Sequence, residues 1–398
     1  MKRIALAVAA CCAAPAWAAG NNSFNPDISL TLQGRYLNAD DIEERHTTGF
    51  LAAGHDHGSE RGFSLDHTEL TLSANVDHYF RGLANFAVAD GEIEVEEAWF
   101  QTLTLDYGFT VKGGRFLSGI GYSNEHHPHA WDFADQSLAY KVLFGEHLIH
   151  DGVQARWLAP TDTFLEFGVE AARGQFFPGS DAGGDKNGAG SSAAFVRIGD
   201  DWGESHSWRA GLSYLHATPE ARESHLEDAS ETEAHAAFSG DSDTWLVDFI
   251  WKWAPDGNPR EQNVKFQAEY FQREENGALT CEDNSTDGGV CIGTTSTYKA
   301  KQSGYYAQLV YQFMPRWRVG YRHDRLDSGT VNFGANSGLL VHEDYNPTRH
   351  SLMLDYSPSE FSRLRLQLAR DESMHGVSDD QVTLQYVMSI GPHGAHKF

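Results

Sequence analysis

The sequence lacks long apolar runs, a surplus of basic residues and more than a few cysteines. Beyond its N-terminal residues, the chain of 398 residues has no stretch of roughly 18 apolar residues, the length a membrane-crossing helix needs. Its 30 lysines and arginines face 56 aspartates and glutamates, and the net charge of -26 excludes nucleic acid as a partner. Four cysteines exclude a disulfide-rich scaffold. The chain also lacks a Gly-x-Ser-x-Gly elbow and a phosphate-binding glycine loop, so we do not expect an enzyme.

The N-terminal residues have the pattern of a secretory signal peptide. A basic start (Met1–Arg3) precedes the apolar stretch Ile4–Ala14 and a small-x-small cleavage site that ends at Ala18. We therefore expect residues 1–18 to be a signal peptide and residues 19–398 to form a single domain. A lipoprotein signal that ends at Cys11 is the alternative.

The rest of the chain alternates between apolar and polar residues. In Trp245–Trp253, tryptophan, valine and phenylalanine occupy one face of an extended chain, and Asp248 and Lys252 occupy the other. The same pattern recurs along the chain with an unusually aromatic apolar side. A closed barrel in lipid, apolar outside and polar inside, requires this arrangement.

The pattern predicts an all-β, antiparallel transmembrane barrel of about sixteen strands. Short turns and long loops alternate between the strands, which indicates short periplasmic turns and long external loops. Seven of the aromatic residues lie beside the short turns, where an interfacial girdle is expected. The predicted strands are 27–37, 63–75, 82–90, 92–105, 109–118, 151–158, 163–172, 192–199, 206–216, 243–253, 263–273, 303–314, 316–325, 348–357, 361–371 and 380–390.

The alternation also predicts which side chains face the inside of the barrel. They are polar and roughly balanced in charge, so we expect a water-filled lumen. Cross-strand ion pairs that rigidify the wall are the alternative role for most of them. Among the residues predicted to face the lumen are Glu69, Glu166, Glu170, Arg197, Arg209, Asp248, Lys265 and Glu269.

Four segments resemble a family of proteobacterial outer-membrane proteins: Asn22–Leu30, Glu69–Asp77, His129–Asp135 and Tyr311–Gly320. Its members are labelled either as porins similar to phosphate-selective porins O and P or as zinc-regulated TonB-dependent outer membrane receptors. The resemblance spans nearly the whole mature chain and implies a porin-like barrel. A TonB-dependent receptor needs about 22 strands and a plug domain, for which we expect no room before the first strand.

The loop 119–150 is the longest external loop. By its position it is similar to the third external loop of sixteen-stranded porins, which folds inward and narrows the pore. Loop carboxylates opposite wall arginines would create a transverse field across such a constriction. The predicted constriction residues are Glu125, Asp132 and Asp135 on the loop and Arg318, Arg322, Arg363 and Arg365 on the wall.

Histidines gather in the predicted external segments and raise the question of metal binding. Imidazole and carboxylate ligands suit zinc, copper or nickel. Nonspecific attraction of cations by acidic loops is the alternative, since no His-Glu-x-x-His spacing occurs. The candidate metal ligands are His55, His57, His126, His127 and His129.

Two cysteines, Cys281 and Cys291, fall in one predicted external loop. In an oxidising envelope we expect them to form a disulfide, with a cysteine metal site as the alternative.

These observations predict a porin-like channel in the outer membrane of a Gram-negative bacterium, for passive diffusion of small solutes or ions, with divalent metal (zinc) uptake as one form. The alternatives are an anion (phosphate)-selective porin and a non-conducting, metal-binding surface protein. No cofactor is required by this reading, and zinc or another divalent cation is the candidate ligand. The expected partners are outer-membrane lipid, lipopolysaccharide, the barrel assembly machinery and the solutes, with a homotrimer as a candidate assembly.

Overall fold

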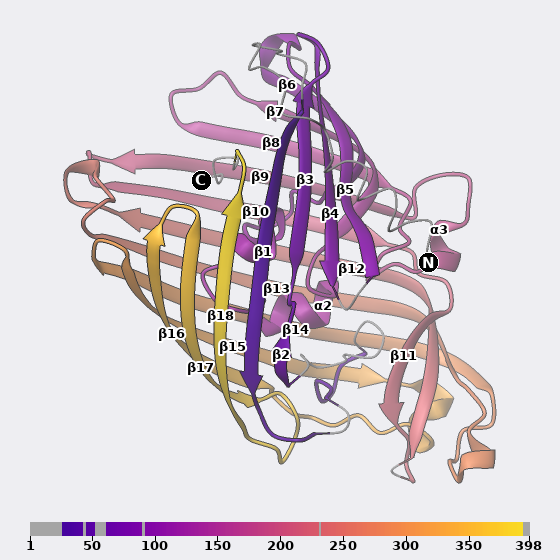
Figure 1. Cartoon of the computed structure of the whole chain (residues 1–398). Helices are drawn as coiled ribbons and strands as arrows, with labels where there is room; N and C mark the ends of the chain where they lie inside the picture. Colours follow the sequence, from indigo (N-terminus) through magenta and orange to yellow (C-terminus); the bar gives the residue numbers. More distant parts are fainter. Residues whose placement is uncertain (1–25, 43–44, 52–60, 90–91, 231, 393–398) are drawn as a thin grey trace, which may run out of the picture.

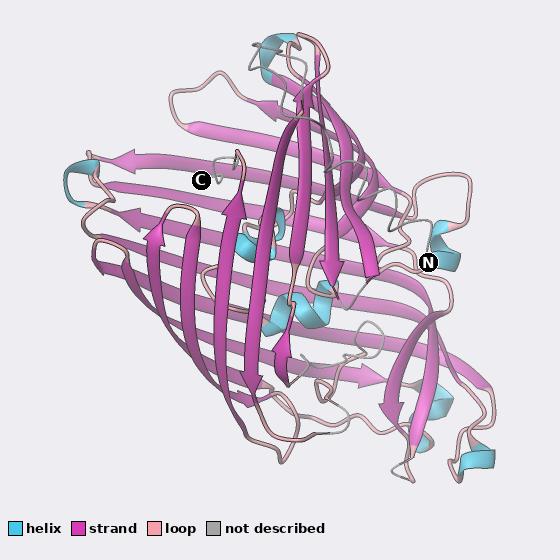
Figure 2. Cartoon of the chain, in the orientation of Figure 1, coloured by secondary structure: helices cyan, strands magenta, loops and turns pink. Residues whose placement is uncertain are grey.

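A computed structural model shows a closed antiparallel β-barrel whose first and last strands lie side by side (Figure 1). The structure describes residues 26–42, 45–51, 61–89, 92–230 and 232–392. The expected signal peptide, residues 1–18, lies outside the described residues. Figure 2 shows that strands make up nearly all of the wall and that the helices are few and short. Among the described residues, no helix is long and apolar enough to cross a membrane.

Antiparallel strands follow one another along the chain, joined by both short turns and long loops. The strands are β1 (Asp27–Asn38), β2 (Gly62–Ser64), β3 (Thr68–Asn75), β4 (Phe80–Ala89), β5 (Glu92–Thr102), β6 (Phe109–Leu117), β7 (Ile149–Leu158), β8 (Phe164–Ala172), β9 (Ser191–Trp202), β10 (His206–Ala217), β11 (Arg222–Glu227), β12 (Glu233–Trp253), β13 (Asn263–Cys281), β14 (Thr294–Met314), β15 (Trp317–Asn332), β16 (Thr348–Ser359), β17 (Ser362–Glu372) and β18 (Asp379–Ile390). The α-helices are α2 (Leu138–Phe144) and α3 (Asp181–Gly184). The short 3-10 helices are η1 (Asp106–Gly108), η2 (Ser123–Glu125), η3 (Pro128–Ala130), η4 (Pro255–Gly257), η5 (Ser285–Asp287) and η6 (Gly334–Gly338).

Sixteen of these strands form the wall, as the sequence predicted. Each wall strand pairs with its neighbours in the chain, and β1 pairs with β18 from Leu30↔Ile390 to Asn38↔Val382, which closes the barrel. The other two strands are additions. β2 pairs with β1 just ahead of β3, and β11 pairs with the first residues of β12.

The predicted inside and outside faces of the wall strands are confirmed. On β12, Trp245 and Val247 are each 49% exposed on the outer face, whereas Leu246 and Asp248 are each 1% exposed and point inward. Lipid removes the penalty for exposing apolar groups and leaves no water for unpaired backbone groups. A closed barrel with an apolar outer face is therefore built for a membrane.

Four strands extend well past the ends predicted for them. The predicted loops 217–241, 274–302 and 326–346 contain β11 and the outer ends of β12, β13, β14 and β15. The prediction was wrong here because these ends carry polar residues where a lipid-facing strand carries apolar ones. The ends pack around a small apolar core (Leu51, Ala234, Ala236, Phe238, Leu279, Cys281, Cys291, Tyr298, Ala300, Phe333 and Leu340). Cys281 and Cys291 are joined by a disulfide within this core.

The lumen differs from the water-filled, polar interior expected from the sequence, because an apolar core occupies part of it. Helix α2 lies inside the barrel (Figure 2), where Ser137 caps its N-terminus and Gly145, at a φ of 63°, ends it. Its side chains are apolar all round apart from Lys141 and the hydroxyl of Tyr140, as expected of a helix packed on every side. Inward apolar residues from six wall strands surround it: Phe195, Leu215, Leu246, Phe271, Tyr306 and Leu326.

Candidate functional site

The segment between β6 and β7, residues 118–148, enters the barrel and is held as a closed loop at its base. The backbone N–H of Ser118 donates to the carbonyl of Leu148 over 2.9 Å. The buried amide of Asn124 donates to both of those residues' carbonyls, each over 2.9 Å, and accepts from the N–H of Leu148 over 2.7 Å. We call residues 118–148 the inward loop.

A single wall carboxylate, Glu269 on β13, receives the first turn of the inward loop. The backbone N–H groups of Tyr122 and Ser123 donate to it over 3.1 and 2.9 Å. The hydroxyl of Tyr140, on α2, donates to it over 2.9 Å, and the hydroxyl of Tyr306 donates from β14 over 2.5 Å. Three of these four donors belong to the inward loop, and together the four satisfy the hydrogen-bonding capacity of the buried carboxylate. We therefore assign Glu269 a structural role in holding the loop.

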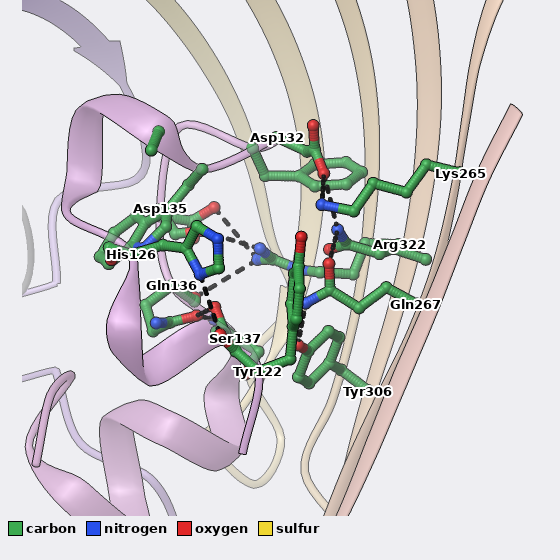
Figure 3. A pocket seen from close by; sticks show the side chains of 15 residues that line it. Tyr122, His126, Asp132, Asp135, Gln136, Ser137, Lys265, Gln267, Tyr306 and Arg322 are labelled. Carbon is green, nitrogen blue, oxygen red and sulfur yellow. Dashed lines mark hydrogen bonds and ion pairs between the residues drawn. The ribbon is translucent and has the colours of Figure 1, made fainter. Parts of the chain in front are cut away.

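Three loop carboxylates form ion pairs with basic residues of the wall. Asp132 lies 2.9 Å from both Arg318 and Lys265, and Figure 3 shows the Asp132–Lys265 contact.

The second carboxylate, Asp135, lies 3.1 Å from Arg322 and 2.6 Å from Arg349. The third, Glu125, lies 2.7 Å from Arg197 and also pairs with Arg156.

The other two predicted arginines, Arg363 and Arg365 on β17, hold the backbone of the loop. Both donate to the carbonyl of Trp131, over 3.1 and 2.8 Å. Asp355 on β16 lies between them and Arg318, 2.9 Å from Arg365 and 2.5 Å from Arg318. All seven predicted constriction residues therefore lie where the inward loop meets the wall, and their role in limiting passage remains a prediction.

Sequence reasoning left four of the basic partners out of the constriction: Lys265, Arg349, Arg197 and Arg156. Lys265 is on the predicted inner face of β13, and Arg349 is the second residue of β16. The alternation of each strand places these side chains inside. The alternation gives the face on which a side chain lies, but it does not give the depth in the barrel at which the inward loop meets each strand.

A hollow remains between the inward loop and the part of the wall made by β1 and β16–β18. Basic side chains outnumber carboxylates along it. The charged residues that line it are Arg35, Arg45, Lys141, Arg349, Asp135 and Asp371.

The candidate metal ligands fall into separate places. His126 lies in the pocket between the loop and the β13–β15 wall (Figure 3), where its Nδ1 donates to the carbonyl of Tyr122 over 2.9 Å. Burial, with Lys265 nearby, lowers the pKa of His126 to about 3. His127 and His129 turn instead towards carboxylates of β3 and β5. His55 and His57 lie outside the described residues.

A second group of metal-ligand side chains lies outside the membrane region. His225, Glu233 and His235 lie together where β11 pairs with β12. Glu233 and His235 are exposed, and the Nδ1 of His225 lies 2.9 Å from the Glu233 carboxylate.

Solved structures with the same fold are outer-membrane proteins. A loop-deletion form of OmpT from Vibrio cholerae matches with a TM-score of 0.56 and 12% identity, over 93% of this chain and 100% of that one. OprB from Pseudomonas putida matches with a TM-score of 0.56 and 13% identity, over 92% and 94% of the two chains. The outer membrane channel DcaP from Acinetobacter baumannii matches with a TM-score of 0.52 and 12% identity, over 94% and 100%.

These likenesses show the fold, a sixteen-stranded β-barrel of the kind found in Gram-negative outer-membrane proteins, and the apolar outer face suits a barrel set in lipid. No family model matches the chain. An uncharacterized protein of Aquifex aeolicus (strain VF5) is 33% identical over 400 residues, which cover 94% of this chain and 80% of the relative. The chain belongs to the same family as this Aquifex protein.

Proposed function

We propose that the protein is a channel through which small solutes or ions cross the outer membrane by passive diffusion. The observation that carries this proposal is the inward loop held across a sixteen-stranded barrel by ion pairs on several strands, with a hollow left beside it. The loop narrows the lumen, and the hollow along β1 and β16–β18 is the proposed path. DcaP, which shares the fold, is described as an outer membrane channel.

Selectivity for cations is the leading form of this proposal. The chain carries a net charge of -26, so that the external surface attracts cations and raises their local concentration. Divalent metal ions such as zinc belong to the proposed permeants, because imidazole and carboxylate side chains meet at the inner wall.

Selectivity for anions is the second candidate, and the hollow itself favours it. Four basic side chains and two carboxylates line this path. Rings of basic side chains draw anions into a pore. A phosphate-selective porin, one of the labels attached to the resembling family, would have such a lining.

Planar-bilayer recording on the purified barrel tests these proposals together. A steady current in a salt gradient supports a channel, and the sign of the reversal potential separates cation from anion selectivity. Arg45→Glu and Arg349→Gln are informative variants, because both side chains line the hollow. The reversal potential should shift towards cations in both variants if the hollow is the path. A wild-type barrel that inserts into the bilayer but carries no current would contradict the channel proposal and favour the non-conducting, metal-binding alternative.

We also propose that the protein works without catalysis and assembles as a homotrimer. OmpT of Vibrio cholerae, which shares the fold, has been solved in a trimer form. Many lipid-facing residues of the wall are large and apolar, Phe167 and Val169 of β8 among them. Such a face can bury area against a second copy as well as against lipid. Mass measurement in detergent tests the assembly, and a monomer under conditions that preserve conductance would contradict it.

A further inference from the structure

A β-bulge in the wall brings two successive glutamates to the inner face of the barrel. The pairing of β4 with β5 shifts by one residue, since Asn85 pairs with Glu97 and Phe86 pairs with Val95. Glu96 is the extra residue. In a regular strand Glu96 and Glu97 would point to opposite faces, and one of them would lie in lipid. The bulge turns both inward, and such bulges commonly re-aim side chains at functional sites.

The two glutamates meet side chains from β3, from the residue just before it (His67) and from the inward loop. The Nε2 atom of His67 lies 3.0 Å from the Glu96 carboxylate and 3.6 Å from that of Glu69. From the loop, the Nδ1 atom of His127 lies 3.2 Å from Glu96 and 3.6 Å from Glu69. Two imidazoles and two carboxylates therefore converge, and those of His67, Glu69 and Glu96 have ligand atoms within 4.8 Å of one another.

The cluster gathers three carboxylates that are largely withdrawn from solvent. Glu69, Glu96 and Glu97 have side chains that are 1%, 14% and 11% exposed. Glu69 and Glu96 form ion pairs with His67 and His127. Buried carboxylates without a compensating charge are costly. A bound divalent cation would supply that charge.

Two atoms of the cluster lack a hydrogen bond. Within the part of the chain that the structure describes, the buried Nε2 of His67 and Oε2 of Glu96 make no hydrogen bond of acceptable geometry. A purely structural network of buried imidazoles and carboxylates would be expected to satisfy these atoms. His67, Glu69 and Glu96 can each offer one ligand atom within 4.8 Å of the others, which places these three around a common point, with His127 next to Glu96.

The distances and the outer contacts fit a borderline transition metal. Zinc binds histidine nitrogen and carboxylate oxygen at about 2.0–2.2 Å, so that tetrahedral ligand atoms lie roughly 3.3–3.6 Å apart. The separations of 3.0, 3.2 and 3.6 Å lie around this range. The second ring nitrogen of His127 lies 3.0 Å from Glu97, the carboxylate–histidine arrangement that orients metal ligands. His129 and Asn85 contact the Glu69 carboxylate at 2.7 and 2.9 Å.

We propose that His67, Glu69, Glu96 and His127 form a binding site for one divalent transition-metal ion, such as zinc, on the inner wall of the barrel. Glu97 acts as a positioning residue through His127. The ion bridges β3, β5 and the inward loop and so fastens this end of the loop to the wall. The site goes beyond the proposed conduction, because a barrel can bind a metal ion whether or not it passes current.

Cobalt titration of the purified, chelator-treated barrel in detergent tests the site directly. Co²⁺ bound by nitrogen and oxygen ligands in four-coordinate geometry gives a visible ligand-field band, and zinc should displace it. We expect one equivalent of Co²⁺ per chain. Glu96→Gln, which preserves shape, and His67→Ala should each lose the band. Glu97→Gln should keep the band with an affinity roughly 10–100-fold lower, the effect of removing an outer partner.

The matched control is His126→Ala, since this histidine lies on the same loop but in another pocket. It should bind Co²⁺ like the wild type. Equal binding in Glu96→Gln and the wild type, equal loss in His126→Ala, or no stoichiometric binding at all would each overturn the site. The shift in gel mobility on heating identifies variants that fail to fold. If His67→Ala is one of them, the isosteric variant Glu96→Gln alone decides the test. Conductance is recorded on the same metal-free samples, so failure of the channel proposal is seen separately.

Discussion

Asp132 of the inward loop and Arg318 of β15 lie 2.9 Å apart inside the barrel, with the Asp132 side chain only 7% exposed. Removing one partner of a buried ion pair leaves the other uncompensated and costs about 3–5 kcal/mol. We therefore expect Asp132→Asn to loosen the loop and to raise the single-channel conductance and its fluctuations. Bilayer recording checks this, with Asp380→Asn, whose carboxylate is exposed, as the control. Unchanged conductance in Asp132→Asn would mean that the pair does not limit passage.

Apolar packing should hold the loop as firmly as its charges do. Leu143 of α2 is fully buried, and Phe144 lies 5.7 Å from the ring of Phe271. Truncation of buried residues of this kind costs about 2–5 kcal/mol. Leu143→Ala should expose the inward loop to protease in a barrel that still resists heat in detergent, whereas Glu146→Ala, at an exposed site, should not. Equal protease resistance of Leu143→Ala and wild type would contradict the packing argument.

Acid should release the loop only at low pH. Burial raises the pKa of Asp132, but Lys265 and Arg318 hold it well below the usual 3.8. Asp135 is likewise held low by Arg349 and Arg322 against the effect of burial. A depressed folded pKa gives stability that is present above the unfolded pKa and is lost as pH falls towards the folded pKa.

Conductance should therefore stay constant as pH falls from about 7 to 5 and increase only below about 4. The double variant Asp132→Asn, Asp135→Asn should have the larger conductance at every pH. Recording over this range checks the expectation, and a change between pH 7 and 5 in the wild type would instead point to histidines.

The disulfide should stabilise the outer ends of the strands rather than the barrel. Cys281 and Cys291 are buried in the apolar core formed by these ends. Removal of a disulfide typically costs roughly 2–4 kcal/mol. Replacing both cysteines by serine should make the segment between β13 and β14 sensitive to protease, while heat resistance of the barrel remains. Loss of the folded barrel would show that the two regions unfold together.

Most of the wall could be predicted from the sequence, because lipid on one side and water or charge on the other impose a period of two. The prediction failed where that contrast ends. The outer ends of β12–β15 face water outside the membrane. Inside the barrel, Leu246 and Phe271 are apolar on the inward face because they pack against α2. Neither the water-exposed strand ends nor the apolar inward positions beside α2 show the apolar-outside, polar-inside alternation from which the wall was predicted.

Part of the candidate site could also be predicted, namely the loop carboxylates and the wall arginines that they contact. Of the proposed metal site, the sequence indicated His127 as a candidate ligand and Glu69 as a lumen-facing residue, whereas His67, Glu96 and Glu97 were not singled out. One signal was available. Ile93 and Val95 predict an outward face that would place Glu97 in lipid two residues later, so a bulge is required.

The length of the four extended strands bears on how the cell surface is recognised. β12 has 21 residues, whereas a tilted strand crosses the bilayer in about 9–11. Roughly five to ten residues per strand, at about 3.3 Å each, thus stand above the lipid as paired sheet. An antibody or a phage approaching from outside therefore meets a rigid, disulfide-linked sheet rather than flexible loops. The surface it binds depends on the folded structure and is lost when the protein is boiled.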